Sequence, residues 1–262
     1  MTTPSVTTSP VCGAPCWVSL ATADLSAAQR FYGDVLGWTF RPGSLGEEFS
    51  VALADGVPVA GLGAVARSMQ VRVEWTPFFS VYSADVAASR VQERSATVAV
   101  GPIRMGSGRT ALCADPSGAT FGFWEGEVLR SWHVGDQHPP ARLELRTRDA
   151  FAMAIFYGEV FEWATGEGRP EVDYQYDAVI VRVGGRAVAT LLGGAIGEAP
   201  DPQVRPRWQV SFYVRDVDEV AAAAVRAGGR IMAGPVDTPF GRTAGLSDPE
   251  GGLFTVAAGD HH

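Results

Sequence analysis

The sequence contains two motifs that each occur twice in the same order. The segment Phe31 to Trp38 (FYGDVLGW) returns as Phe156 to Trp163 (FYGEVFEW), and Gly108 to Gly118 (GRTALCADPSG) returns as Gly241 to Gly251 (GRTAGLSDPEG). Segments repeated in order are typical of an internal duplication, in which each copy forms a similar structural unit. The duplication predicts two related halves, and the residues that differ between the halves are the candidates for function.

The first quarter of the chain has the pattern of a strand, a helix and further strands. Asp24 is a favourable helix N-cap, and Gly37 ends the predicted helix. Between them, apolar residues recur at helical spacing: Ala28, Phe31, Tyr32 and Val35. Asp55-Gly56 separates two apolar runs and predicts a hairpin.

The other three quarters repeat this order. Helices are expected at residues 85–94, from Asp149 onward, and at residues 216–227, and an Asp-Pro turn leads into the last strand of each half. The chain is therefore predicted to be an α+β protein with four βαβββ modules and curved mixed sheets around cavities. The modules form two tandem domains, residues 12–126 and 141–259, joined by a polar linker at residues 127–140.

Composition limits the partners and the chemistry of this chain. A net charge of −8 over 262 residues provides no basic stripe for nucleic acid, and no apolar run approaches the 18 residues of a membrane span. No secretion signal is visible at the start, so a cytoplasmic protein with three free thiols is expected. Lysine is absent, which rules out a Schiff base with pyridoxal phosphate on this chain.

The repeated motifs resemble those of one protein superfamily. A helix-capping Asp followed by Phe-Tyr, and Gly-Arg-Thr-Ala followed by Asp-Pro-x-Gly before a final strand, are similar to the vicinal oxygen chelate (VOC) superfamily, also called glyoxalase/bleomycin resistance/dioxygenase proteins. The resemblance covers Ala14 to Ala257. Within the superfamily the chain most resembles tandem-domain actinobacterial proteins called hydroxylases or glyoxalase-like, including accessory proteins of aromatic polyketide pathways.

The resemblance also implies where metal ligands would lie. Metal-dependent members place His, Gln or Glu on the first strand of each module and Glu on the last strand of each half. In this sequence those positions hold Trp17, Thr76, Gly122, Arg142, Gln209 and Thr255. Only Gln209 is a suitable donor, and a divalent metal needs three or four converging donors. No metal and no cofactor are therefore expected.

The residues that share a strand face with these positions form the predicted site. In the first half the face is aromatic and nearly uncharged, with Trp17, Ser19, Thr76, Phe78 and Trp124 as ligand-binding candidates. In the second half it is polar and charged. Its ligand-binding candidates are Gln209, Ser211 and Thr255, and its catalytic candidates are Glu144, Arg142, Arg146 and Tyr213.

Glu144 is the candidate base, because the flanking arginines favour its ionised form, and Arg142, Arg146 and Tyr213 are the candidates for stabilising developing negative charge. Two alternatives stay open at this point. The charged face could lie open to water at a domain edge, and the aromatic side chains could simply pack in a core or interface. The modules could pair within a half, or the first with the fourth and the second with the third.

Three functions are consistent with the sequence. The first is a metal-independent VOC protein of secondary metabolism that binds a bulky, partly aromatic small molecule and transforms it by acid/base chemistry, in biosynthesis or self-resistance. The second is a metal-dependent lyase, isomerase or dioxygenase, and the third is a non-catalytic interaction module. The expected partner is a hydrophobic or aromatic small molecule, with no nucleic acid or membrane, and the expected state is a monomer or homodimer.

Overall fold

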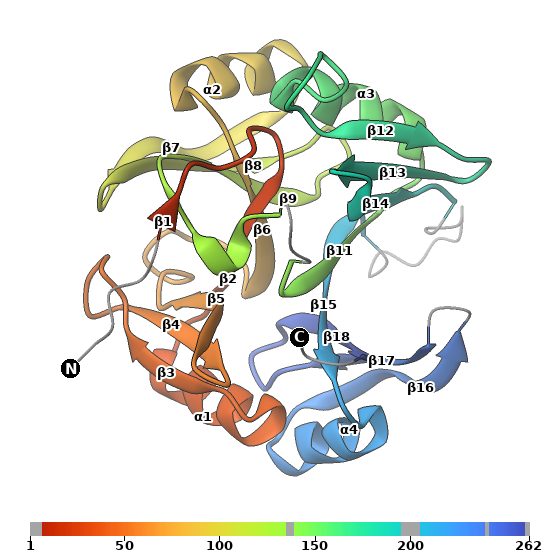
Figure 1. Ribbon diagram of the computed structural model, residues 1–262. Coiled ribbons are helices and arrows are strands. Elements are labelled where there is room, and N and C mark those ends of the chain that lie inside the picture. The colour runs from red at the N-terminus through yellow and green to blue at the C-terminus, as the bar shows by residue number, and fades with distance from the viewer. Residues whose placement is uncertain (1–6, 135–138, 195–204, 239–240, 260–262) are drawn as a thin grey trace. The chain divides into compact units, whose positions relative to one another are not determined.

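The computed structural model describes residues 7–134, 139–194, 205–238 and 241–259 and contains four βαβββ modules (Figure 1). The first module is β2 (Pro15–Ala21), α1 (Leu25–Leu36), β3 (Thr39–Pro42), β4 (Phe49–Ala54) and β5 (Val57–Gly63). The second is β6 (Glu74–Ser80), α2 (Ala84–Glu93), β7 (Thr97–Met105), β8 (Gly108–Ala114) and β9 (Thr120–Glu125). The third is β11 (Ala141–Arg146), α3 (Ala150–Phe161), β12 (Glu171–Tyr174), β13 (Ala178–Val183) and β14 (Arg186–Leu192). The fourth is β15 (Arg207–Val214), α4 (Val217–Arg226), β16 (Arg230–Thr238), β17 (Gly241–Ser247) and β18 (Leu253–Ala258).

The strands form two eight-stranded mixed sheets, which confirms the predicted α+β fold class. The strand orders are β3-β4-β5-β2-β6-β9-β8-β7 and β12-β13-β14-β11-β15-β18-β17-β16. In every module the first and last strands run parallel, and the three strands after the helix are joined antiparallel. Each sheet thus draws its strands from two consecutive modules.

The contacts divide the chain into two compact units that follow a different grouping. The first unit consists of Met1–Trp17 and Pro77–Trp208, and the second of Val18–Thr76 and Gln209–His262. The first unit thus holds the second and third modules with α2 beside α3, and the second unit holds the first and fourth modules with α1 beside α4 (Figure 1). Of the two pairings that the sequence left open, the compact units follow the pairing of first with fourth and second with third.

Helix α1 illustrates how closely the local sequence fixes an element. The Asp24 side chain accepts a hydrogen bond from the Ala27 backbone N–H at 2.9 Å, which caps the first turn. Gly37 closes the helix in the left-handed conformation, with a φ of 69°. The buried residues of this helix are the four that the periodicity predicted.

Buried hydrogen bonds connect the repeated motifs within the second unit. The Tyr32 hydroxyl donates to Asp248 at 3.0 Å and accepts from Trp75 Nε1 at 2.9 Å. The other carboxylate oxygen of Asp248 accepts from two backbone N–H groups of its own turn, at Glu250 and Gly252. Burial raises the pKa of Tyr32 well above its ordinary value, so the hydroxyl stays a donor.

The first unit repeats this arrangement with its own copies of the motifs. Tyr157 donates to Asp115 at 2.9 Å and accepts from Trp208 Nε1 at 2.9 Å. Burial raises the pKa of Tyr157 in the same way. In both units the last aromatic residue of the motif stacks on the tyrosine, Trp38 on Tyr32 and Trp163 on Tyr157. The duplicated segments therefore join modules to one another.

The stretch predicted as a linker contains structure that its polarity did not suggest. It includes strand β10 (Val128–Leu129), which pairs with β1 (Thr7–Thr8), and the 3-10 helix η1 (Arg130–Trp132). Trp132 in this stretch is fully buried. The predicted domain boundaries at residues 126 and 141 stay a prediction.

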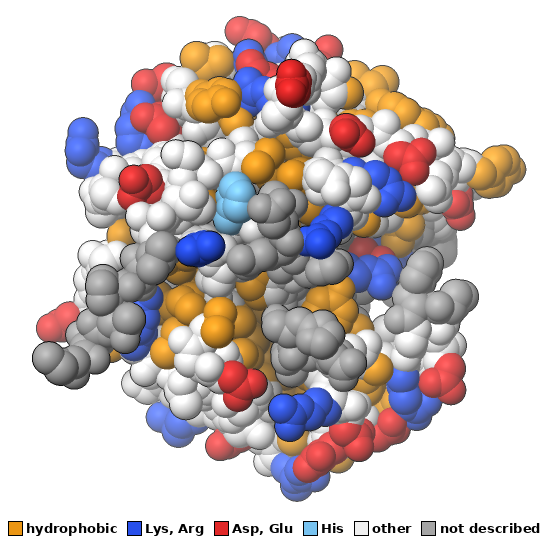
Figure 2. Space-filling view, in the orientation of Figure 1, with side chains coloured by type: hydrophobic (Ala, Val, Ile, Leu, Met, Phe, Trp, Pro, Cys, Tyr) orange, Lys and Arg blue, Asp and Glu red, His pale blue; other side chains and the backbone are white. Residues whose placement is uncertain are grey.

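Charged side chains of both signs are interspersed on the face drawn in Figure 2. The arginines of the second motif form ion pairs, since Arg109 pairs with Asp85 at 2.7 Å and Arg242 pairs with Asp218. Each carboxylate lies in the first turn of the helix of its module, so each ion pair joins a strand to the helix of the same module. No helix among the described residues is long and apolar enough to cross a membrane.

We expect Tyr32→Phe and Tyr157→Phe each to lower the free energy of unfolding by about 1–3 kcal/mol, because each leaves a buried carboxylate oxygen and an indole N–H without a partner. Urea unfolding followed by tryptophan fluorescence measures this loss. Tyr176→Phe is the matched control, since Tyr176 is 99% exposed, and its effect should stay within about 0.5 kcal/mol. Equal stability of all three variants would show that the buried hydrogen bonds do not stabilise the modules.

Candidate functional site

The structure divides the predicted site residues between the two units. The first unit contains Trp17, Phe78, Trp124, Arg142, Glu144 and Arg146. The second unit contains Ser19, Thr76, Gln209, Ser211, Tyr213 and Thr255.

The three aromatic candidates in the first unit pack against the protein. Trp17 lies edge-on to Trp132, with ring centroids 5.7 Å apart. Trp124 donates its Nε1–H to the Glu127 carbonyl at 2.9 Å and covers Gly108, where an added Cβ would overlap the indole ring. All three rings keep partial exposure. Packing therefore accounts for these side chains, and their role as ligand-binding residues stays a prediction.

Phe78 occupies the space beside one of the implied metal-ligand positions. Phe78 on β6 and Gly122 on β9 are register partners, and a Cβ at Gly122 would overlap the Phe78 ring. A carboxylate side chain at residue 122 cannot be accommodated without moving that ring. The ring thus blocks the place of a ligand in the first half.

The second half also lacks a suitable donor set. Arg142 stands at one implied position and Thr255 at another, and a guanidinium repels a cation. Among the described residues, no group of three or more His, Cys, Asp and Glu side chains is arranged to hold a metal ion. His138, His261 and His262 lie outside those residues. The side chains present do not fit the divalent metal of the superfamily.

Strand β11 carries the charged candidates on one face. Leu143 and Leu145 are fully buried on its core side, while Arg142, Glu144 and Arg146 alternate with them on the other side. Glu144 forms an ion pair with Arg142 and is only 7% exposed. The alternative that this face lies open to water is therefore wrong for Glu144.

Neighbouring strands extend this face with half-buried side chains. Thr190 on β14 lies opposite Glu144, Leu192 lies opposite Arg146, and Ile180 on β13 lies opposite Thr190. The resulting surface combines one carboxylate and several arginines with apolar and hydroxyl groups. Such a mixture suits an organic ligand with a polar end.

Arg207 is a member of this face that sequence reasoning missed. It is the first residue of β15, the neighbour of β11, and it precedes the buried Trp208, so its side chain lies on the face opposite to that indole. Burial, and then the positive charge of Arg146, lowers the pKa of Arg207. The signal that could have found it is alternation: Arg207 is two residues before Gln209.

The candidate residues of the second unit lie on strands, and their pairing and burial are as follows. Ser211 on β15 is paired in register with Thr255 on β18, and Tyr213 with Ala257. Ser211 is buried and Tyr213 is half-buried. Thr76 is also buried, and Ser19 is paired with Gly61 on β5. The functional roles of these residues stay predictions.

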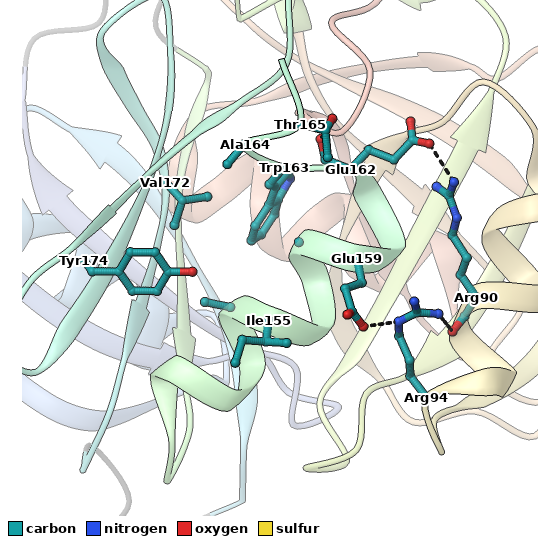
Figure 3. A pocket seen from close by; sticks show the side chains of 12 residues that line it. Arg90, Arg94, Ile155, Glu159, Glu162, Trp163, Ala164, Thr165, Val172 and Tyr174 are labelled. Carbon is teal, nitrogen blue, oxygen red and sulfur yellow. Dashed lines mark hydrogen bonds and ion pairs between the residues drawn. The ribbon is translucent and has the colours of Figure 1, made fainter. Parts of the chain in front are cut away.

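A separate groove lies on the helix side of the first unit (Figure 3). It has a volume of about 450 Å³ and is lined by α2, α3, β12 and the residues that follow α3. Its arginines are neutralised, since Arg90 pairs with Glu162 and Arg94 pairs with Glu159 (Figure 3). None of the predicted site residues lines this groove.

The three cysteines are free, as expected, and all are buried. Burial raises the pKa of each thiol, that of Cys113 to about 12. A neutral buried thiol is a poor nucleophile, so the cysteines take no part in the candidate site.

We expect Gly122→Ala to lower the free energy of unfolding by about 1–3 kcal/mol, because the new methyl group overlaps the Phe78 ring. Phe78→Ala in the same chain should remove part of this cost, which urea unfolding of the single and double variants would measure as a coupling. Gly158→Ala is the control. No heavy atom lies within 4 Å of its added Cβ in helix α3, so it should be neutral or stabilising. Strict additivity of the two changes would contradict the predicted contact.

Comparison with known proteins supports the fold and its duplication. A family model described as "Glyoxalase-like domain" matches residues 142–257, and one described as "Bleomycin resistance protein-like N-terminal" matches residues 16–48. The anthracycline biosynthesis protein DauV of Streptomyces sp. (strain C5) is 33% identical, over 93% of this chain and 92% of that protein. The putative glyoxylase CFP32 of Mycobacterium tuberculosis (strain CDC 1551 / Oshkosh) is 31% identical, over 93% of this chain and 94% of that protein.

Solved structures share the fold at low sequence identity. The Mn(II)-bound glyoxalase from Novosphingobium aromaticivorans has a TM-score of 0.55 and 16% identity, covering 94% of this chain and 82% of that one. A catechol 2,3-dioxygenase has a TM-score of 0.58 and 12% identity, covering 95% of this chain and 89% of that one. Together with the full-length relatives and the duplicated βαβββ modules, these similarities establish that the chain belongs to the glyoxalase-like family of the VOC superfamily.

Proposed function

We propose that this protein binds a bulky, partly aromatic small molecule of secondary metabolism without a metal ion and transforms it by acid/base chemistry at Glu144. The observation that carries the proposal is a buried carboxylate on a strand face that otherwise bears arginines. A buried, positioned carboxylate among cationic groups is an arrangement that can both remove a proton and stabilise the anion that results.

The relatives support the class of ligand. Two full-length relatives from Streptomyces are named anthracycline biosynthesis proteins. The half-buried Ile180 and Leu192 add apolar surface to the charged face of β11, which suits a ring system with a polar substituent. The bleomycin-resistance-like match at residues 16–48 is consistent with binding of a bulky natural product.

Metal independence is proposed from the donor set. Trp17 and Arg142 replace ligands on two first strands, and the Phe78 ring covers the ligand position at Gly122. Charge stabilisation would then come from arginine side chains, which provide fixed positive charge and directed N–H donors.

The proposed step is removal of a proton from a carbon that lies next to a carbonyl group or is conjugated to it through an aromatic ring. The Glu144 carboxylate takes the proton, and the electron pair of the broken C–H bond moves to the carbonyl oxygen, which becomes an enolate or phenolate. Arg142 and Arg146 share the strand face with Glu144 and would stabilise that oxygen. Tyr213 lies in the second unit, and its role stays a prediction.

Exchange of carbon-bound hydrogen in D2O tests the catalytic part with anthrone, a tricyclic aromatic ketone, under anaerobic conditions. We expect the protein to accelerate deuterium uptake at the carbon opposite the carbonyl, and Glu144→Gln to reduce that acceleration by about 10²- to 10⁴-fold, because the base is removed at constant shape. Proton NMR measures the uptake. Glu171→Gln, an exposed change on β12, is the matched control and should leave the rate unchanged.

Binding of a neutral probe tests the other part. Anthraquinone-2-carboxamide should quench tryptophan fluorescence with the same Kd in wild type, in Glu144→Gln and in chelator-treated protein. If the probe binds all three samples equally but the protein does not accelerate deuterium exchange, the protein sequesters its ligand and is not an enzyme for this reaction. A stoichiometric divalent metal in the purified protein, lost on chelation together with the exchange activity, would contradict the proposal in favour of a metal-dependent VOC enzyme.

A further inference from the structure

We infer that Arg146 and Arg207 together bind a carboxylate group that the ligand carries before any reaction, so that the ligand is an aromatic carboxylic acid. This inference rests on the proposed function and defines the substrate class more narrowly. In this arrangement Arg146 binds the carboxylate of the ligand, and Arg142 on the same face stabilises the oxygen that becomes negative during the reaction.

The placement of the two arginines follows from the backbone. Arg146 ends β11 and Arg207 begins β15, and these strands are neighbours in one sheet. Leu145 and Trp208, the adjacent residues on each strand, are buried on the core side, so both arginines lie on the opposite face. Both guanidinium groups therefore stand on the face that carries Glu144.

Neither arginine has an acidic partner among the described residues. Arg142 on the same face pairs with Glu144, and elsewhere in this unit Arg90, Arg109 and Arg182 pair with Glu162, Asp85 and Asp173. Arg146 and Arg207 are half-buried and form no ion pair in the described parts of the chain. In this respect they differ from the partly buried arginines of this unit that form ion pairs.

Two like charges held together at a partly buried position repel each other. Burial of Arg207 and repulsion by Arg146 lower the pKa of Arg207. An arginine nevertheless stays protonated at neutral pH. The unfavourable interaction is therefore present in the free protein. An anion that is present before the reaction relieves it, whereas a charge that develops only in a transition state does not.

A carboxylate matches this pair in charge and in hydrogen-bonding capacity. Its two oxygens can accept two parallel N–H bonds from one guanidinium, or one bond from each of two. Leu192 beside Arg146 and Ile180 beside Thr190 provide the apolar surface on which the ring system would lie. Glu144 on the same face then reacts with a group of the ligand away from its carboxylate.

The test compares three probes that share one ring system: anthraquinone-2-carboxylate, its neutral carboxamide and anthraquinone-2-sulfonate. We expect the carboxylate to bind wild-type protein about 10- to 100-fold more tightly than the carboxamide, since charge-assisted hydrogen bonds are gained. The sulfonate should bind less tightly than the carboxylate. Titration calorimetry or tryptophan quenching gives each Kd.

Variants then assign the effect to the two residues. Arg146→Gln and Arg207→Gln should each remove most of the preference for the carboxylate, because each weakens binding of the carboxylate far more than binding of the carboxamide. Urea unfolding reports that each variant is folded. Arg148→Gln removes one exposed positive charge two residues from Arg146 and is the matched control, with the preference retained.

The outcomes separate this inference from the proposed function. Equal binding of carboxylate and carboxamide by the wild type would overturn the inference and leave the proposed function standing. Equal or tighter binding of the sulfonate would overturn the assignment to a carboxylate. Binding of none of the probes would overturn both. If both Arg146→Gln and Arg207→Gln retain the preference for the carboxylate, the carboxylate binds elsewhere and the assignment to these two residues is wrong.

Discussion

A hydrogen bond between a buried tyrosine and a buried aspartate couples modules that are far apart in the sequence. Tyr32 reaches Asp248 in one unit, and Tyr157 reaches Asp115 in the other. The aspartate is fixed by the backbone of its own turn, and the tyrosine is fixed by an indole donor and a stacked tryptophan. The strands that follow each turn, including β18 with Thr255, are positioned through this network, and so are the residues on their faces.

The duplication and the periodicity predicted the modules well, because both are local properties of the chain. The cap at Asp24 and the buried face of α1 need only the residues within that segment. The partner of each tyrosine could not be predicted in the same way. Both halves carry the same Asp-Pro turn, so Tyr32 was equally suited to Asp115 and to Asp248, and packing of α1 with α4 decides between them.

Alternation along β11 predicted that Arg142, Glu144 and Arg146 share a face, because a strand has a period of two regardless of its surroundings. Arg207 was missed because Gln209 is the first candidate that the sequence offered on that strand, and β15 begins two residues before it. The environment of Phe78 was also out of reach. That ring fits only because its register partner is Gly122. The register between two separate strands depends on both of them and cannot be predicted from the sequence of one.

The contact between Phe78 and Gly122 ties the identity of one residue to that of the other. A side chain that carries a carboxylate at residue 122 would occupy the space of the phenyl ring, so the two groups are not compatible in this conformation. Any variant of this chain that is given a side-chain ligand at residue 122 therefore needs a smaller residue at position 78 as well.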